Sequence, residues 1–169
     1  MTKNVARTVY LLIALIVVLL DRWTKYIVAR RIALYSHIQV IPGFFRLTHT
    51  ENTGAAFSLF ADSHAPWKTG MLIAFSVIAL VVVSVLLWKN NHAHILTGVA
   101  FSLILGGAIG NLWDRVTSGR VVDFLLFYLK RYQWPVFNLA DSAIVVGAGL
   151  LVLEIVFGPK KHAGKTHIQ

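Results

Sequence analysis

Thr69–Trp88 reads TGMLIAFSVIALVVVSVLLW, an apolar stretch that contains no charged residue. At about 1.5 Å of rise per residue, a helix of this length crosses roughly 30 Å of hydrocarbon. Ile95–Trp113 is likewise uncharged, and Val136–Phe157 contains only two charged residues. The three stretches therefore predict three membrane-spanning helices, over residues 69–88, 95–113 and 136–157.

A fourth span is predicted near the N-terminus, where the apolar run Tyr10–Leu20 is too short to cross a bilayer alone. To span, the helix must continue through Asp21 and cover about residues 9–28, which places one carboxylate inside the membrane. A cleaved signal peptide is the alternative, because basic residues precede the apolar run. The polar sequence that follows the run contains no convincing cleavage site, so a retained span is favoured.

The composition agrees with a membrane protein. Of the 169 residues, 57% are hydrophobic and 14% charged, and the mean hydropathy is +0.68, so polar residues are too few to cover a water-facing surface. The absence of cysteine excludes disulfides, thiolate metal sites and cysteine nucleophiles. The net charge of +9 is spread between the apolar runs, which favours phospholipid head groups over nucleic acid as the partner.

Four spans in one domain, residues 1–169, place both chain termini on one side of the membrane. The long connections, about residues 29–66 and 114–135, lie on the other side, and the short link Lys89–His94 makes spans two and three a helical hairpin. Six basic residues fall on the side of the termini and ten on the side of the long connections. A positive-inside count would put the long connections in the cytoplasm, but most of those ten residues cluster in one loop, so the orientation stays open.

The first long connection predicts a small β element in an otherwise all-α membrane protein. Ile38–Ile41 and Phe44–Thr50 alternate in character and are separated by Pro42-Gly43, which indicates strand, turn and strand. A two-stranded ribbon is marginal in water, so it is expected to rest on the bilayer surface or on other loop strands. Ala55–Ala61 is apolar enough to form a short helix in the membrane interface.

The same topology brings every carboxylate except Glu154 to one face of the membrane. A carboxylate within a span costs about 2.5–3.5 kcal/mol on insertion scales, so it needs a partner or a function. Residues three apart share a helix face, as Asn111 and Asp114 do in span three and Asn138 and Asp141 in span four. Glycines near these helix ends allow close packing; they are Gly106, Gly107, Gly110, Gly147 and Gly149.

Each polar residue also has a purely structural interpretation. Asp21 precedes Lys25 by four residues, which is compatible with an ion pair on the helix surface or with a polar contact inside the bundle. Asp114 beside Arg115 is typical of an interfacial ion pair. Asp141 at the start of span four could simply stabilise the helix dipole.

Asp123 is harder to explain structurally, because apolar residues flank it on both sides and desolvation raises the pKa of a carboxyl group. If Asp123 and Asp141 approach each other, they cannot both remain ionised and would titrate as a pair. One carboxyl could then accept a proton from water while the other donates to a carbonyl oxygen. Peptide hydrolysis at the membrane surface requires this division of roles.

Five segments occur in the order found in a known family: DRWTK (21–25), NTGAAF (52–57), GGAIGNLWDR (106–115), VDF (122–124) and FNLAD (137–141). In them the chain resembles the bacterial lipoprotein signal peptidases (signal peptidase II), membrane aspartic endopeptidases that remove signal peptides from diacylglyceryl-modified prolipoproteins. Each segment alone is a weak signal, but five together, from span one to span four, are specific.

The resemblance implies that Asp123 and Asp141 form the catalytic dyad that activates water, and that no metal or other cofactor is used. The residues it implies as substrate-binding or supporting are Asn52, Gly54, Asn111, Arg115, Asn138 and Asp21. It also implies cleavage before the lipid-modified cysteine, inhibition by the cyclic peptide globomycin, and a monomer in the bacterial cytoplasmic membrane. The active site and β element would face outward, with both termini cytoplasmic.

Three other classes of function remain as alternatives. A proton-coupled transporter or channel subunit would space its carboxylates across the membrane, whereas these crowd at one face. A membrane scaffold would use the glycines and ion pairs only for packing. A Ser/Lys peptidase would require a paired nucleophile and base, and nothing in the sequence pairs Ser58 with Lys68.

Overall fold

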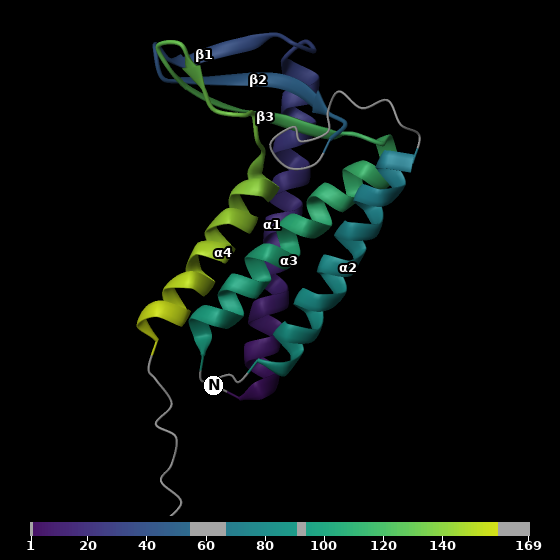
Figure 1. Cartoon of the computed structure of the whole chain (residues 1–169), viewed down its shortest axis with the longest axis vertical. Coiled ribbons are helices and arrows are strands. Elements are labelled where there is room, and N and C mark those ends of the chain that lie inside the picture. Colours follow the sequence, from purple (N-terminus) through teal and green to yellow (C-terminus); the bar gives the residue numbers. More distant parts are fainter. Residues whose placement is uncertain (1, 55–66, 91–93, 159–169) are drawn as a thin grey trace, which may run out of the picture.

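The computed structural model describes residues 2–54, 67–90 and 94–158. The described chain forms four long helices and four strands, in the order α1, β1, β2, α2, α3, β3, β4, α4 (Figure 1). Their bounds are Lys3–Arg31 (α1), His37–Ile41 (β1), Phe45–Asn52 (β2), Trp67–Lys89 (α2), Ile95–Ser118 (α3), Val121–Leu129 (β3), Tyr132–Gln133 (β4) and Leu139–Phe157 (α4).

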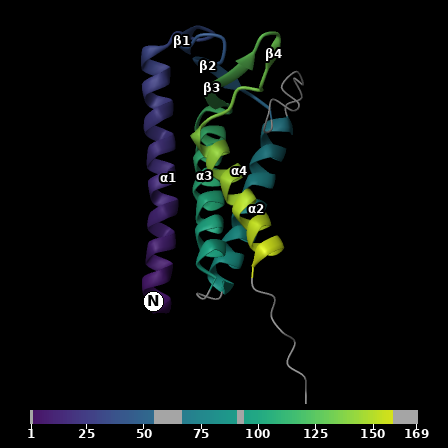
Figure 2. The same cartoon turned by 90° about the vertical axis from the view of Figure 1, so that its left-hand side faces the viewer.

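The helices form a bundle with the sheet at one end and the start of α1 and the end of α4 at the other (Figure 1). Figure 2 shows α1 standing along one edge of the bundle, while α3 lies in the middle. Helix α3 contacts each of the other three helices, and α1 also touches α4. The predicted fold class, four spanning helices with a small β element, is confirmed. The predicted helix over Ala55–Ala61 lies outside the described residues.

All four helices are long and apolar enough to cross a membrane. Helix α1 has 29 residues, about 44 Å at the usual rise, so it is longer than the predicted 9–28 and carries its basic ends beyond the hydrocarbon. Most large apolar side chains along the helices are exposed on the protein surface, as contact with lipid requires. The chain is a multi-pass membrane protein.

Helix α4 begins at Leu139, three residues after the predicted start of span four at Val136. Phe137, two residues before the helix, is held by β3 instead: its N–H donates to Leu125 O at 3.1 Å, and its carbonyl accepts from Leu125 N at 2.8 Å. Apolar character continues through this strand contact into the helix, so hydropathy alone could not separate the two.

The predicted hairpin is confirmed, because β1 and β2 pair antiparallel on either side of the turn at Pro42-Gly43. The sheet has the order β1-β2-β3-β4, so the hairpin rests on other strands of the protein, as one of the two expectations had it. Strand β3 lies in the second long connection, for which no strand was predicted. Its sequence, VVDFLLFYL, is rich in β-branched and aromatic residues and follows a Ser-Gly turn, which is a strand signal.

Two apolar clusters enclose a layer of polar side chains. One cluster, near the end of the bundle that holds the termini, contains Tyr10, Leu87 and Leu105. The other joins the end of α1 to the sheet through Val28, Ile32 and Phe124. Between them lie buried polar residues of α1, α3, β3 and the start of α4: Asp21, Lys25, Asn111, Asp114, Asp123 and Asn138.

Glycines bring the helices close together, as predicted for Gly106, Gly107, Gly110 and Gly147. A Cβ built on Gly106 would lie 2.7 Å from Ala14 O of α1, and one on Gly147 would lie 2.7 Å from Ala100 O of α3. Gly149 is different, because a Cβ there meets nothing within 4 Å. The prediction that Gly149 also serves close packing is therefore wrong.

This contrast gives a matched pair of variants on one helix. Gly147→Ala should lower the thermal unfolding temperature in detergent, because the methyl group must push α4 from the α3 backbone, at a typical cost of about 1–3 kcal/mol. Gly149→Ala should leave it unchanged or slightly higher, because alanine restricts the unfolded chain. Equal unfolding temperatures for the two variants would contradict the packing described here.

Candidate active site

Asp123 and Asp141 are brought together by Asn138, which immediately precedes α4. The Asn138 amide nitrogen donates to Asp123 Oδ1 at 2.7 Å, so the loop before α4 is tied to strand β3. The Asn138 amide oxygen accepts from the backbone N–H of Asp141 at 2.9 Å, and Asp141 Oδ2 accepts from the backbone N–H of Asn138 at 3.2 Å. One fully buried amide therefore contacts both carboxylate residues.

The reciprocal contacts between Asn138 and Asp141 form a capping box at the start of α4. The backbone N–H of Ala140, the second residue of α4, donates to Asp21 Oδ1 at 3.0 Å. The first turn of a helix has unpaired N–H groups and a partial positive charge, so both carboxylates lie where negative charge is stabilised. Asp141 therefore stabilises the start of α4, as its structural interpretation has it. It also lies close to Asp123, because Asn138 contacts both residues.

Asn52, at the end of β2, supplies a second donor to Asp123. Its amide nitrogen lies 3.0 Å from Asp123 Oδ2. Its amide oxygen accepts from the backbone N–H of Gly54 at 2.8 Å, so this N–H fixes which end of the amide faces the carboxylate. The strand itself is held nearby, since Thr50 Oγ1 donates to the backbone oxygen of Asp123 at 3.1 Å.

Asn111 of α3 connects Asp141 to Lys25, which belongs to a group of ion pairs between α1 and α3. Its amide nitrogen donates to Asp141 Oδ1 at 2.8 Å, while its amide oxygen accepts from Asn138 at 3.1 Å and from Lys25 Nζ at 3.0 Å. Arg115, one turn further along α3, donates to the backbone oxygen of Asn111 at 3.3 Å.

Lys25 pairs with two carboxylates, lying 2.8 Å from Asp21 Oδ2 and 2.8 Å from Asp114 Oδ2. Asp114 also pairs with Arg22. The side chain of Lys25 is 2% exposed and that of Asp21 is 0% exposed, so this ion pair lies inside the bundle and not on the helix surface. The interpretation of Asp21 as a polar contact within the bundle is therefore the correct one.

Asp123 has an unusual electrostatic environment. Burial and, secondly, the negative charge of Asp141 raise the pKa of Asp123 from 3.8 to about 7, against the hydrogen bonds from Asn52 and Asn138 that act in the other direction. A carboxyl group with a pKa near neutral can hold a proton and release it at physiological pH, as an acid–base catalyst must.

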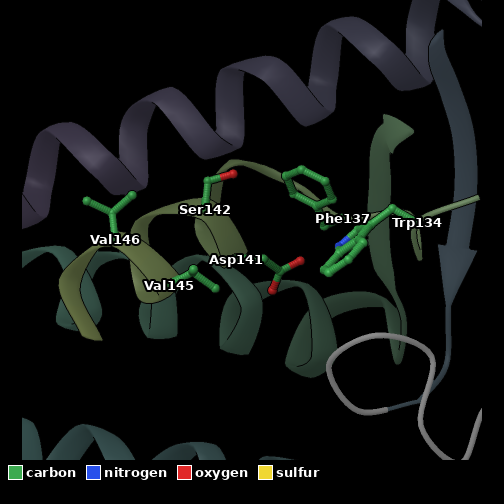
Figure 3. Close-up of a pocket in the computed structure, with 6 residues that line it drawn as sticks. All are labelled: Trp134, Phe137, Asp141, Ser142, Val145 and Val146. Carbon is green, nitrogen blue, oxygen red and sulfur yellow. The ribbon is translucent and has the colours of Figure 1, made fainter. Parts of the chain in front are cut away.

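Asp141 borders two hollows in the protein surface. One, of about 280 Å³, runs along α4 and is lined by Trp134, Phe137, Ser142, Val145 and Val146 (Figure 3). The other, of about 310 Å³, lies between α2, α3 and α4, and Asn111 and Arg115 line it together with apolar residues such as Phe75. Both hollows are mostly apolar, and Asp141 lines both.

The structure brings all the predicted site residues to one layer at the sheet end of the bundle, with Asp123, Asp141, Asn52, Asn111 and Asn138 in direct hydrogen-bond contact. Gly54 acts through its backbone N–H, and Arg115 and Asp21 adjoin the group.

Sequence reasoning missed Lys25, which it treated only as a partner of Asp21. A lysine four residues after an intramembrane aspartate, with another polar helix end at the same depth, was the available signal.

A known protein family matches most of the chain. The family profile described as "Signal peptidase (SPase) II" matches residues 13–157. The chain belongs to the signal peptidase II family. Membership identifies it as a membrane peptidase, and the matched region extends from α1 to the end of α4 and so contains every residue of the candidate site.

Individual members of the signal peptidase II family are similar over almost their whole length. A "Lipoprotein signal peptidase" of Symbiobacterium thermophilum is 43% identical over 153 residues, which are 89% of this chain and 96% of that protein. One of the same name from Solibacter usitatus is 40% identical over 154 residues, 91% of this chain and 93% of that protein.

The fold also matches a solved structure described as a bacterial membrane enzyme determined by the in meso method at 2.3 Å resolution. The TM-score is 0.80 at 32% sequence identity, and the match covers 94% of this chain and 95% of the other. The arrangement of bundle and sheet is therefore shared with an experimentally determined membrane enzyme.

The raised pKa of Asp123 makes stability depend on pH in a definite direction. The folded protein holds this proton to about pH 7, whereas the unfolded chain releases it near 3.8, so folding takes up a proton in between. The stabilising contribution is complete below the lower value and lost as the pH rises through the higher one. The thermal unfolding temperature of the wild type should therefore fall, relative to Asp123→Asn, between about pH 4 and about pH 8. Parallel curves for the two proteins would contradict this assignment.

Proposed function

We propose that the chain is an aspartic endopeptidase that removes signal peptides from diacylglyceryl-modified prolipoproteins and cleaves before the lipid-modified cysteine. Membership of the signal peptidase II family and the names of its relatives support the substrate class. The observation that carries the chemistry is the contact of Asn138 with both Asp123 and Asp141, which holds two carboxylates in unlike environments at one site.

Their environments suggest different roles for the two carboxyl groups. Asp123, with its pKa raised to about 7, carries the proton and donates it to the carbonyl oxygen of the scissile bond. Asp141 accepts a proton from the water that attacks the carbonyl carbon. In the collapse of the tetrahedral intermediate, the C–N bond breaks, Asp141 returns its proton to the leaving nitrogen, and a hydroxyl of the intermediate returns a proton to Asp123.

The surroundings of Asp141 suit a substrate with two apolar parts. A prolipoprotein has a hydrophobic signal helix on one side of the scissile bond and a diacylglyceryl group on the other. The two hollows, both lined by Asp141 and otherwise mostly apolar, offer room for one apolar part each. Arg115 and Asn52 adjoin the dyad with hydrogen-bond donors and would bind the peptide backbone.

We further propose that the enzyme acts as a monomer in the bacterial cytoplasmic membrane, surrounded by phospholipid. The sheet and the dyad would lie at the outer face, where exported prolipoproteins appear, and both termini would be cytoplasmic. No metal or other cofactor takes part, because the dyad activates the water. Globomycin would bind at the same site as the substrate.

The proposal is tested with purified protein and a diacylglyceryl-modified prolipoprotein in detergent or lipid. The wild type should cleave before the modified cysteine, whereas Asp123→Asn and Asp141→Asn should each lower kcat by at least about 10³-fold, because neither amide can accept or donate the catalytic proton. Retained cleavage by either variant would refute the dyad.

Folding and cofactor controls accompany this assay. Both variants should elute as the wild type does on size-exclusion chromatography, and EDTA should leave wild-type cleavage unchanged. Inhibition by EDTA would contradict the cofactor-free mechanism. Asn52→Ala should weaken both cleavage and globomycin binding, because Asp123 loses one of its two amide donors.

A further inference from the structure

Lys25 lies behind the dyad and does not touch either of its carboxylates in the described contacts. Its ammonium group has three donors, and three acceptors surround it: Asp21, Asp114 and the amide oxygen of Asn111. Two of these contacts are ion pairs, which explain how a lysine can be buried at membrane depth. The third contact is to a neutral amide, which the charge of Lys25 does not require.

That third contact orients Asn111, together with the NH₂ group of Asn138, which donates to the same amide oxygen at 3.1 Å. An ammonium group only donates hydrogen bonds, so the end of the amide that faces it, at 3.0 Å from Nζ, must be the oxygen. The NH₂ end then faces Asp141 Oδ1, at 2.8 Å. If the amide turned over, its NH₂ group would meet the ammonium group, and its oxygen would meet the carboxylate.

The other amides of the site are oriented in the same way, but by backbone donors. The N–H of Asp141 fixes Asn138, and the N–H of Gly54 fixes Asn52. Asn111 differs, because the two described donors to its amide oxygen are side chains, the NH₂ group of Asn138 at 3.1 Å and the ammonium group of Lys25 at 3.0 Å. The charged one of these two donors is contributed by α1.

We propose that Lys25 is a positioning residue of the peptidase, which acts through Asn111 by holding the amide with its NH₂ group toward Asp141. This inference rests on the proposed function, since the role of Asp141 in catalysis gives the orientation its purpose. Lys25 touches neither water nor substrate in this scheme. Its effect is on the geometry and charge stabilisation of the carboxylate that accepts the proton.

Arg22 provides a matched control, because it belongs to the same ion-pair group and makes no contact with Asn111 among the described residues. It pairs with Asp114 from the adjacent position on α1, and its side chain is 39% exposed. Loss of Arg22 removes a positive charge near Asp114, with which Lys25 also pairs, but leaves the contact between Lys25 and Asn111 in place. A general effect of disturbing the ion pairs would appear in both variants, whereas an effect on amide orientation would appear only with Lys25.

The experiment measures prolipoprotein cleavage for Lys25→Met in an Asp21→Asn background. The background avoids an unpaired carboxylate, which would destabilise the fold, and the asparagine oxygen can still accept from Ala140 N. Relative to Asp21→Asn alone, Lys25→Met should lower kcat by about 10²-fold with little change in KM, as misplacement of a catalytic group does. Arg22→Gln should change kcat by less than about threefold.

A double-mutant cycle separates positioning from a loss of folded protein. Repeated with Asn111→Ala also present, Lys25→Met should have no further effect on kcat, because the amide through which it acts is gone. An equal loss of kcat with and without Asn111 would overturn the proposal and indicate a structural role. Unchanged kcat for Lys25→Met in the presence of Asn111 would overturn it as well.

These outcomes are independent of the test of the dyad. If Asp123→Asn or Asp141→Asn retained cleavage, the proposed function would fail whatever Lys25 does. If both are inactive and the cycle is additive, the dyad stands and only the role of Lys25 is refuted.

Discussion

The hydrogen bonds of Asn138 are the interaction on which the site depends. Asn138 stands at the junction between β3 and α4, two elements that come from different layers of the protein. Its amide nitrogen reaches Asp123 on the strand, and its oxygen caps the helix that carries Asp141. The same contacts therefore start a membrane-spanning helix and set the spacing of the two carboxylates, so the fold and the chemistry share one constraint.

The second constraint is the cost of placing charge in the membrane region. The polar layer lies between two apolar clusters, and most of its members are buried. Behind the dyad, Asp21 and Asp114 are paired with Lys25 and Arg22, so that group carries no net charge. The carboxylate of Asp123 has amide donors instead of a cation in contact, and burial then raises its pKa to about 7. Among the described ion pairs, none includes Asp123 or Asp141.

Much of this arrangement could be predicted from the sequence, because four spans leave little freedom in which residues share a membrane face. Hydropathy alone predicted that Asp21, Asn111 and Asp141 lie at one membrane depth, and the Pro42-Gly43 turn predicted the hairpin. The start of α4 could not be separated from its apolar surroundings, since a buried strand and a spanning helix have similar composition. Strand β3 did carry a strand signal in its β-branched and aromatic residues, but no strand was predicted there. The contacts of Lys25 with Asp114 and Asn111 join different helices, so helical spacing within α1 did not reveal them, although the polar end of α3 at the same depth was a signal.

The central claim is that Asp123 holds a proton near neutral pH, because it is buried and lies close to the negative charge of Asp141. It is tested most directly by following the ¹³C carboxyl signal of Asp123 in labelled protein, identified by its absence in Asp123→Asn, as the pH is varied without substrate. The account predicts a midpoint near pH 7 in the wild type and a lower midpoint in Asp141→Asn, where the neighbouring negative charge is gone. A wild-type midpoint at the ordinary value, about 4, unchanged by Asp141→Asn, would contradict it.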